Sequence, residues 1–248
     1  MKIGIIGVGH IGKTLALKLA EAGHDIAVAN SRGPEYIDEG VLATGARAVT
    51  IQQAVEDKDV IILSIPLNRI PEVAPLLKDV LEGTTVIDTS NYYPAHDNKI
   101  DDIEAGQVES LWVVEQLGRP IAKAWNAIGS HSLVVNGKPA GSKERIAIPI
   151  SADRDIDREV TTKLINDTGF DAFNTGSLAD SWRQQPGAPA YCTDLTLNEL
   201  IAVIDTAEKE RLPKRRDIAV AAIMERLSSP TTNPDADYGV RLSRALYI

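Results

Sequence analysis

Three glycines near the N-terminus are the residues whose spacing most directly indicates chemistry. Gly7, Gly9 and Gly12 form a G-x-G-x-x-G motif. A short apolar segment, Lys2 to Ile6, precedes the motif, and an apolar run with helical spacing, Ile11 to Ala22, follows it. In this order the first glycine allows a tight turn, the second admits phosphate oxygens to the backbone, and the third packs helix on strand. The free amides of the helix then point at the anion, so the pattern predicts a dinucleotide site.

The turn after the next expected strand, Asp25 to Ala29, indicates which dinucleotide is bound. It reads Asn30-Ser31-Arg32 and contains no carboxylate, whereas NAD-preferring sites place an acid there for the ribose hydroxyls. A hydroxyl beside a guanidinium suits the additional phosphate of NADP, because arginine bonds phosphate in a bidentate, planar manner. The alternative is an ordinary polar turn with a solvated arginine. We expect NADP(H) as the cofactor.

Apolar, strand-like segments alternate with helical ones along the next ninety or so residues. The expected strands Asp59 to Pro66, Thr84 to Thr89 and Ile121 to Trp125 are separated by helices, which is typical of parallel sheets. Further strands are expected at Glu144 to Ile150 and Ala172 to Phe173. The fold class predicted is α/β, a Rossmann-type doubly wound, mostly parallel sheet of about eight strands with a C-terminal helical extension.

In such a sheet, ligands lie at the carboxyl ends of the strands. That rule adds to the three glycines and the turn residues a set of expected cofactor-binding residues: His10, Ile11, Ser64, Ile65, Pro66, Leu67, Asn91, Asn126, Ile128 and Ser130. Asn91 and Asn126 could each bond a ribose, the carboxamide or the substrate. The alternative for either is an ordinary turn residue, since asparagine is common at strand ends.

Candidate proton donors are few. Asn126, His131 and Tyr191 are the catalytic candidates, with His131 placed near the expected nicotinamide end. No tyrosine has a lysine four residues on, and no His and carboxylate set has metal-ligand spacing, so no metal site is expected. A carbonyl reductase needs a positioned acid, whereas hydride transfer between two stacked rings needs mainly alignment. The sequence therefore favours ring-to-ring transfer.

Composition excludes several other classes of function. The net charge is −9, which argues against nucleic acid or an anionic membrane as partner. The single cysteine, Cys192, excludes an internal disulfide and a cysteine-built metal site. Neither a signal peptide nor an apolar run of membrane-spanning length is evident, so we expect a cytoplasmic protein with a small-molecule hydride acceptor.

The C-terminal part differs in character. We expect an NADP-binding domain over 1–176 and a loop-and-helix cap or dimerisation region over 177–248. The loop Trp182 to Gly187 either binds the acceptor, with Trp182 stacking and Arg183 holding an anion, or simply packs. Helices are expected at Leu195 to Arg211 and Lys214 to Leu227, then a loop over Ser228 to Asp237 and a short tail. The helices' apolar stripes favour a homodimer.

Several motifs taken together resemble a known family. Gly4 to Gly12, Asn30 to Arg32, Ser64 to Pro66 and Lys123 to Asn126 are similar to the NADP-dependent oxidoreductases typified by deazaflavin-coenzyme (coenzyme F-420):NADPH oxidoreductase. The dinucleotide domain of membrane ferric reductases is similar too. The resemblance covers roughly residues 1 to 180.

The resemblance implies specific roles. NADPH would be bound by the glycine motif, with Ser31 and Arg32 on its 2′-phosphate, and a deazaflavin or flavin would stack near the nicotinamide, under the C-terminal part. Asn126, Ile128 and Ser130 would lie beside the nicotinamide. Asn126 stands where the family has a histidine, and the C-terminus is longer than is typical. Two alternatives stay open: an NADPH-dependent reductase of a small carbonyl or imine, with Tyr191 or His131 as acid, and an NADP-sensing binding protein.

Overall fold

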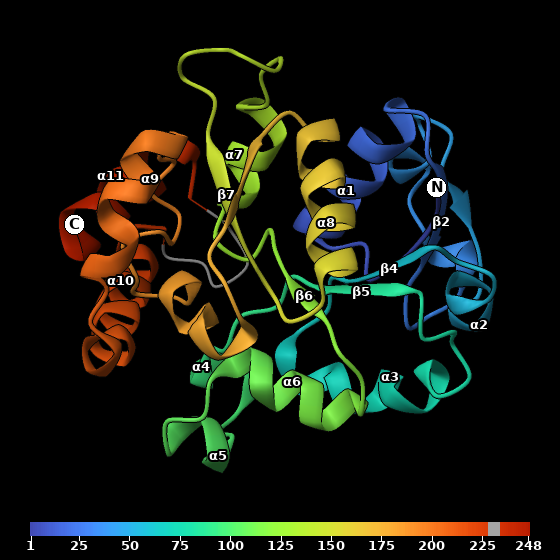
Figure 1. Cartoon of the computed structure of the whole chain (residues 1–248), viewed down its shortest axis with the longest axis horizontal. Helices are drawn as coiled ribbons and strands as arrows, with labels where there is room; N and C mark the ends of the chain where they lie inside the picture. Colours follow the sequence, from blue (N-terminus) through green and yellow to red (C-terminus); the bar gives the residue numbers. More distant parts are fainter. Residues whose placement is uncertain (228–233) are drawn as a thin grey trace.

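The computed structural model describes residues 1–227 and 234–248, and it is built around one eight-stranded sheet in the order β3-β2-β1-β4-β5-β6-β7-β8 (Figure 1). The strands are β1 (Lys2–Ile6), β2 (Asp25–Ala29), β3 (Arg47–Ala48), β4 (Val60–Leu63), β5 (Thr85–Asp88), β6 (Ala122–Lys123), β7 (Ala147–Ala152) and β8 (Asp171–Asn174). All neighbours pair in parallel except β6 and β7, which are antiparallel. The predicted Rossmann-type fold is confirmed.

Helices cover both faces of the sheet and one end of it (Figure 1). One core cluster joins α1 and α8 to the sheet, and a second joins α2, α3 and α6 to its other face. The α-helices are α1 (His10–Glu21), α2 (Ile51–Val55), α3 (Ile70–Leu77), α4 (Pro94–Asp97), α5 (Asp101–Glu104), α6 (Glu109–Leu117), α7 (Ser130–Val135), α8 (Asp155–Asp167), α9 (Leu197–Val203), α10 (Leu212–Leu227) and α11 (Ala236–Tyr247). Short 3-10 helices are η1 (Pro34–Tyr36), η2 (Glu39–Val41), η3 (Leu67–Arg69), η4 (Leu178–Gln184), η5 (Ile204–Thr206) and η6 (Lys209–Arg211).

Local sequence explains most of these elements. Every residue of β4 is buried, as expected for a central strand covered by helices on both faces. Thr50 begins α2 with a capping box, in which its hydroxyl accepts from the Gln53 amide and the Gln53 side chain accepts from the Thr50 amide. Gly4 lets α2 approach the sheet, because an added Cβ would overlap the carbonyl oxygen of Ala54.

The C-terminal region differs from expectation in two places. The helix expected over Leu195 to Arg211 is α9 followed by η5 and η6; the β-branched pair Val203-Ile204 and the Asp205-Thr206 pair are weak helix formers. The expected tail is wrong, since α11 is a regular helix that Asp235 caps by accepting from the Tyr238 amide. Of the loop expected over Ser228 to Asp237, residues 228–233 lie outside the described part.

Within the described residues, no helix is both long enough and apolar enough to cross a membrane. The division at residues 176 and 177 stays a prediction, although β8 ends just before it and α9, α10 and α11 add no strand to the sheet.

Candidate active site

The glycine turn between β1 and α1 has the geometry that an anion site needs. Gly7 has a φ of +100°, and a Cβ there would overlap the carbonyl oxygen of Ser64. A Cβ on Gly12 would overlap the carbonyl oxygen of Gly7, so the helix packs closely on the turn. A Cβ on Gly9 would meet nothing within 4 Å. Space is therefore open where the first amides of α1 are exposed, and a pyrophosphate fits there.

The turn after β2 holds Arg32 at the expected position. Asn30 Oδ1 accepts from the amides of Arg32 and Gly33, each at 2.9 Å, so its side chain shapes the turn. The Arg32 guanidinium lies 5.4 Å from the centre of the Tyr36 ring. Sequence reasoning missed one neighbour: a Cβ on Gly33 would lie 2.7 Å from a carboxylate oxygen of Glu35. Glu35 follows Gly33 in the chain and so lies outside the turn Asn30-Ser31-Arg32, from which the sequence predicts NADP(H).

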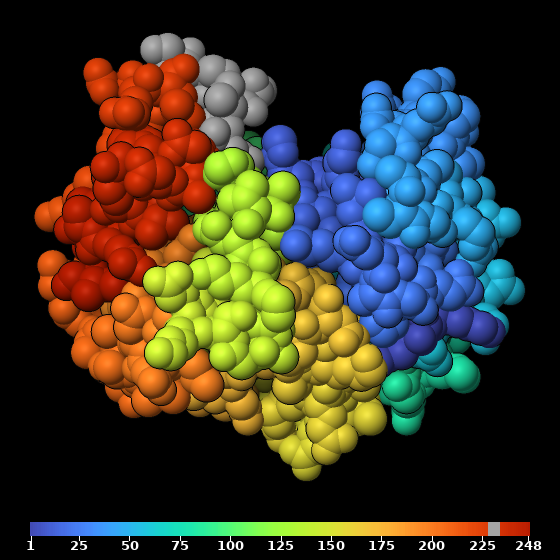
Figure 2. All heavy atoms as spheres, turned by 90° about the horizontal axis from the view of Figure 1, so that it is seen from above, coloured from blue at the N-terminus to red at the C-terminus, as the bar shows by residue number. Residues whose placement is uncertain are grey.

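A cavity of about 580 Å³ lies at the carboxyl ends of β1, β4, β5 and β6, and α10 and α11 form its opposite wall. In Figure 2 the surface is hollowed between the N-terminal segment, in blue, and the C-terminal helices, in red. Twelve of the predicted site residues line the cavity: Gly9, His10, Ile11, Ser64, Ile65, Pro66, Asn91, Asn126, Ile128, Ser130, His131 and Tyr191. The structure thus brings the strand-end residues and all three catalytic candidates together.

The other predicted residues lie elsewhere. Gly7 and Gly12 give the turn its shape but are not among the described residues that line the cavity. The same holds for Asn30, Ser31 and Arg32, which lie in the turn after β2. The expectation that Leu67 binds the cofactor requires a correction. Leu67 is fully buried in the apolar cluster that joins α2, α3 and α6 to the sheet, so it has no surface to offer a ligand.

The loop Trp182 to Gly187 also lies outside the lining of the cavity. Because β7 runs antiparallel to β6 and β8 runs parallel to β7, the carboxyl end of β8 lies at the edge of the sheet opposite to the cavity. The residues directly after β8 therefore pack against α6. The Arg183 guanidinium lies 4.4 Å from the centre of the Trp182 ring, and its Nη1 lies 2.7 Å from Asp180 Oδ1. The chain reaches the cavity again only at Tyr191. Packing, the alternative interpretation of this loop, describes it better than acceptor binding.

Asn91 and Asn126 bond each other across two strand ends. Asn91 Nδ2 donates to the carbonyl oxygen of Asn126 at 2.9 Å, and Asn126 Nδ2 donates to Asn91 Oδ1 at 3.0 Å. Gln184 completes the set, because its Nε2 donates to Asn126 Oδ1 and its carbonyl oxygen accepts from Asn126 Nδ2. The Asn126 amide is thereby fully used within the protein. Its geometry fits a wall-forming residue better than one that exchanges protons with substrate.

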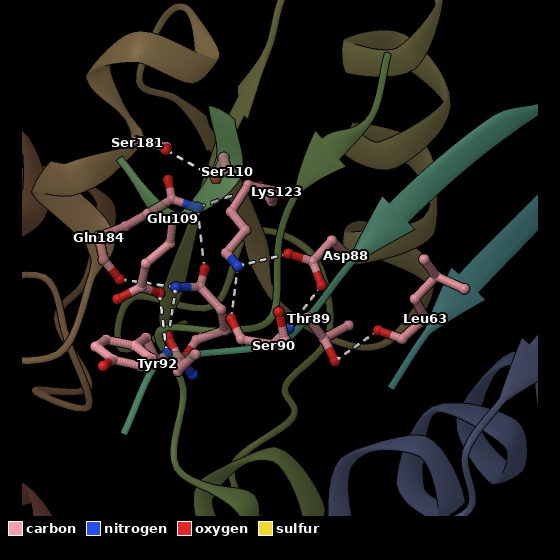
Figure 3. Close-up of polar contacts among 12 residues, drawn as sticks. Leu63, Asp88, Thr89, Ser90, Tyr92, Glu109, Ser110, Lys123, Ser181 and Gln184 are labelled. Atoms are coloured by element: carbon pink, nitrogen blue, oxygen red, sulfur yellow. Dashed lines mark hydrogen bonds and ion pairs between the residues drawn. The ribbon is translucent and has the colours of Figure 1, made fainter. Parts of the chain in front are cut away.

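A buried ion pair fixes the neighbouring part of the wall (Figure 3). Lys123 Nζ donates to Asp88 Oδ2 at 2.6 Å and to the carbonyl oxygen of Ser90 at 2.5 Å. Asp88 Oδ1 accepts from the Ser90 amide at 3.0 Å, so both backbone groups of Ser90 are held. The Ser90 hydroxyl is buried, lines the cavity and has no partner among the described residues. It is a polar group available to a ligand.

Glu109, at the start of α6, holds the backbone between Asn91 and Tyr93, which both line the cavity. Its Oε2 accepts from the Tyr92 amide at 3.1 Å. Burial raises the pKa of the Glu109 carboxyl to about 7, and the nearby Lys123 ammonium and the Tyr92 amide only partly oppose this. A carboxyl in this state exchanges its proton near neutral pH.

Tyr191 has a partner that sequence reasoning missed. Its hydroxyl lies 2.7 Å from the hydroxyl of Tyr93, and both residues line the cavity. Burial raises the pKa of each phenol well above its usual value, so both are protonated. His131 Nδ1 accepts from the Ala236 amide at 2.8 Å, which joins α7 to the start of α11. No short-range sequence signal pairs residues as distant as 93 and 191.

Charge in the cavity differs from that of the whole chain. The lining includes His10, His96, His131 and Arg216. Among the described lining residues Asp235 is the one carboxylate, and it already accepts from the Tyr238 amide as the cap of α11. The described lining therefore carries no excess of negative charge, although the chain as a whole is acidic.

Parts of the chain are similar to known proteins. Residues 2–92 match the family model described as NADP oxidoreductase, coenzyme F420-dependent. The Escherichia coli protein YjhV is 42% identical over 74 residues, which are 30% of this chain and 54% of that protein. The structure of a hypothetical protein from Sinorhizobium meliloti is 28% identical, with a TM-score of 0.68, covering 79% of this chain and 96% of its own. An Arthrobacter protein assigned as an F420-dependent NADP reductase is 16% identical, with a TM-score of 0.58, covering 73% and 87%.

These matches confirm the expected resemblance for the nucleotide-binding part of the chain, residues 2–92. The Arthrobacter likeness shows the fold alone. The chain spans about half the length of YjhV and about a third of the length of two further curated relatives.

Proposed function

We propose that the protein, whose residues 2–92 match the family model described as NADP oxidoreductase, coenzyme F420-dependent, transfers hydride between NADP(H) and a deazaflavin or flavin-like acceptor. One observation carries the proposal: the open space at Gly9, at the start of α1, leads directly into the cavity that the strand ends and the C-terminal helices enclose. A dinucleotide whose pyrophosphate lies at the glycine turn would extend its other end into this cavity.

The chain's own residues would bind and orient the cofactor. The first amides of α1 would bond the pyrophosphate, and Ser31 with Arg32 would bond the 2′-phosphate at the exposed end of β2. Ser90, Asn91 and Ile128 would line the nicotinamide end. When bound, NADPH supplies the hydride. The rigid wall around Ser90 would then serve alignment, which is the main requirement for transfer between two rings.

A second candidate, reduction of a small carbonyl or imine, is favoured by Tyr191. Such a reaction needs a hydrogen-bond donor at the atom that gains charge, and a protonated phenol on the cavity wall meets that need. An NADP-sensing role without turnover is the third alternative.

Equilibrium binding followed by an acceptor screen tests these alternatives. Tighter binding of NADPH than of NADH is expected, followed by NADPH oxidation with deazaflavin or flavin. Oxidation with small carbonyls alone would select the second candidate. Tight NADPH binding without turnover on deazaflavin, flavins, ferric complexes or carbonyls would select the sensor. A protein that binds neither nucleotide would contradict the proposal altogether.

We also propose a homodimer that forms through the C-terminal helices. Apolar side chains outside the cavity lining are exposed on α9 at Ile201 and on α10 at Ile218. Burying them against a second copy would remove apolar surface from water. Light scattering of the purified protein distinguishes a dimer from a monomer.

A further inference from the structure

We propose that the part of the cavity where Tyr93 and Tyr191 share a hydrogen bond, near Tyr247 and Arg216, binds the acceptor, a planar ring with a carbonyl oxygen on its edge and an anionic substituent. This inference rests on the proposed function. It adds the residues that select the acceptor and the chemical class that they select.

The tyrosine pair is the observation that carries the inference. Tyr93 follows the wall segment that Asp88, Lys123 and Glu109 hold, so its backbone is fixed from the sheet side. Tyr191 comes from the segment after η4, almost a hundred residues later in the chain. Their hydroxyl oxygens lie 2.7 Å apart on the cavity wall. Two remote segments thus meet at a single polar point.

The number of protons at this point determines what it can bind. Two protonated phenols contribute two O–H donors, and the bond between them uses one. The hydroxyl that accepts in that bond retains a proton of its own, which can be donated into the cavity. A ligand that bonds this remaining proton offers an acceptor atom, and the carbonyl oxygen of a ring meets that requirement.

The surroundings of the pair are mainly apolar and aromatic. Tyr247 from the last turn of α11 lies close enough to raise the pKa of both Tyr93 and Tyr191 further, although burial is the main cause. The side of α10 that faces the cavity contributes Ala219, Val220, Ile223 and Met224. Such a wall buries a flat, apolar body and leaves few other hydrogen-bonding positions.

Arg216 supplies the cation. Its side chain is 9% exposed, and it lies between this cavity and a smaller one of about 390 Å³. Its Nε donates to Asp217 Oδ1 at 2.8 Å, but the Asp217 side chain is 66% exposed and so neutralises the guanidinium weakly. The guanidinium also lies 5.5 Å from the Tyr92 ring. A buried cation with a solvated partner favours a ligand that brings a carboxylate or phosphate.

Two flavins that differ in one group test this site. Flavin mononucleotide carries a phosphate and riboflavin does not, and binding of each to the protein saturated with NADP⁺ is followed by flavin fluorescence quenching. We expect flavin mononucleotide to bind more tightly. Tyr93→Phe and Tyr191→Phe should each weaken both flavins to a similar extent, by about tenfold for one lost hydrogen bond. Arg216→Gln should weaken flavin mononucleotide by about tenfold or more and leave riboflavin unchanged.

Matched variants separate this site from general damage. Tyr92→Phe removes a neighbouring hydroxyl that bonds Glu104 and lies outside the cavity lining, and Arg215→Gln removes the adjacent cation on α10; neither should alter flavin binding. Arg216→Lys should recover part of the preference for the phosphate.

Binding of NADP⁺ to every variant is the readout that keeps the two proposals apart. It should match wild type, since none of these side chains contacts the glycine turn. Failure of NADP⁺ to bind the wild-type protein would defeat the proposed function and this inference together. With NADP⁺ bound, the absence of flavin binding, or equal losses for both flavins in Arg216→Gln, would overturn the acceptor site alone.

Discussion

Lys123 and Asp88 form an ion pair of 2.6 Å in which both side chains are fully buried. The lysine stands on β6 and the aspartate at the end of β5, so the pair joins two neighbouring strands where the cavity begins. Two buried charges are costly to desolvate, and the pair is retained with its remaining bonds directed at the backbone of Ser90. The pair therefore fixes the shape of the wall.

Removing one member should be far more harmful than removing both. Lys123→Met leaves a buried, unpaired carboxylate and should lower the free energy of unfolding by about 3–5 kcal/mol. The double variant Asp88→Leu, Lys123→Met restores an apolar interior and should recover most of that loss. Urea unfolding measures both. The stable double variant should still bind NADPH more weakly than wild type, because Ser90 has lost its fixed partners. A single variant as stable as wild type would contradict this account.

Glu109 predicts a pH dependence of stability. Its pKa is about 7 in the folded protein, above the ordinary value of 4.5, so between these values the folded state binds a proton that the unfolded chain has lost. The free energy of unfolding should therefore fall as pH rises from about 4.5 to about 7, by about 3 kcal/mol in total. Glu109→Gln keeps an acceptor for the Tyr92 amide and removes the ionisation, so it should lose this contribution. Parallel denaturation series at pH 5 and pH 8 would reveal it, and identical pH profiles for the two proteins would exclude it.

Gly9 and Gly12 should respond differently to the same substitution. An added methyl group at Gly9 meets no protein atom and sits on ordinary backbone with φ of −67°, so Gly9→Ala should fold normally. It should nevertheless weaken NADPH binding by about tenfold or more, because the methyl group occupies the space through which phosphate reaches the amides. Gly12→Ala should instead destabilise the fold, since its Cβ overlaps the carbonyl oxygen of Gly7. Thermal unfolding and nucleotide titration together distinguish the two effects.

Arg32 should discriminate between the two nicotinamide cofactors. Arg32→Ala removes an exposed cation whose expected partner is the 2′-phosphate, so NADPH affinity should fall by about 10- to 100-fold while NADH affinity changes little. Arg69→Ala, which removes an exposed arginine paired with Glu72, is the control and should alter neither. Equal losses for NADPH and NADH would refute the phosphate assignment and point to the nearby Glu35 as the residue that sets cofactor choice.

The strands and the glycine turn were readable from sequence because their signals are local. A buried parallel strand is a run of apolar residues such as Val60 to Leu63, and the turn needs glycine for steric reasons. Sequence reasoning misses α11 because it places the first residues of that helix, Ala236 and Asp237, in a loop, although the cap at Asp235 is a visible signal.

The polar part of the site depends on pairing between distant segments, which one sequence does not reveal. Charged residues inside apolar strand sequences, Asp88 in Thr-Val-Ile-Asp and Lys123 in Ile-Ala-Lys-Ala, are a signal that could have indicated the ion pair. Nothing local indicated that Tyr93 meets Tyr191 or that Arg216 lies over Tyr92, because these contacts form only when the C-terminal helices pack against the sheet.

The opposite wall of the cavity comes from α10 and α11, which contribute no strand to the sheet. The wall nearest the glycine turn and the wall formed by α10 and α11 are therefore built from different parts of the chain. Substitutions on the cavity-facing side of these two helices therefore change the shape and polarity of that wall while leaving the residues of the sheet and of the glycine turn unaltered.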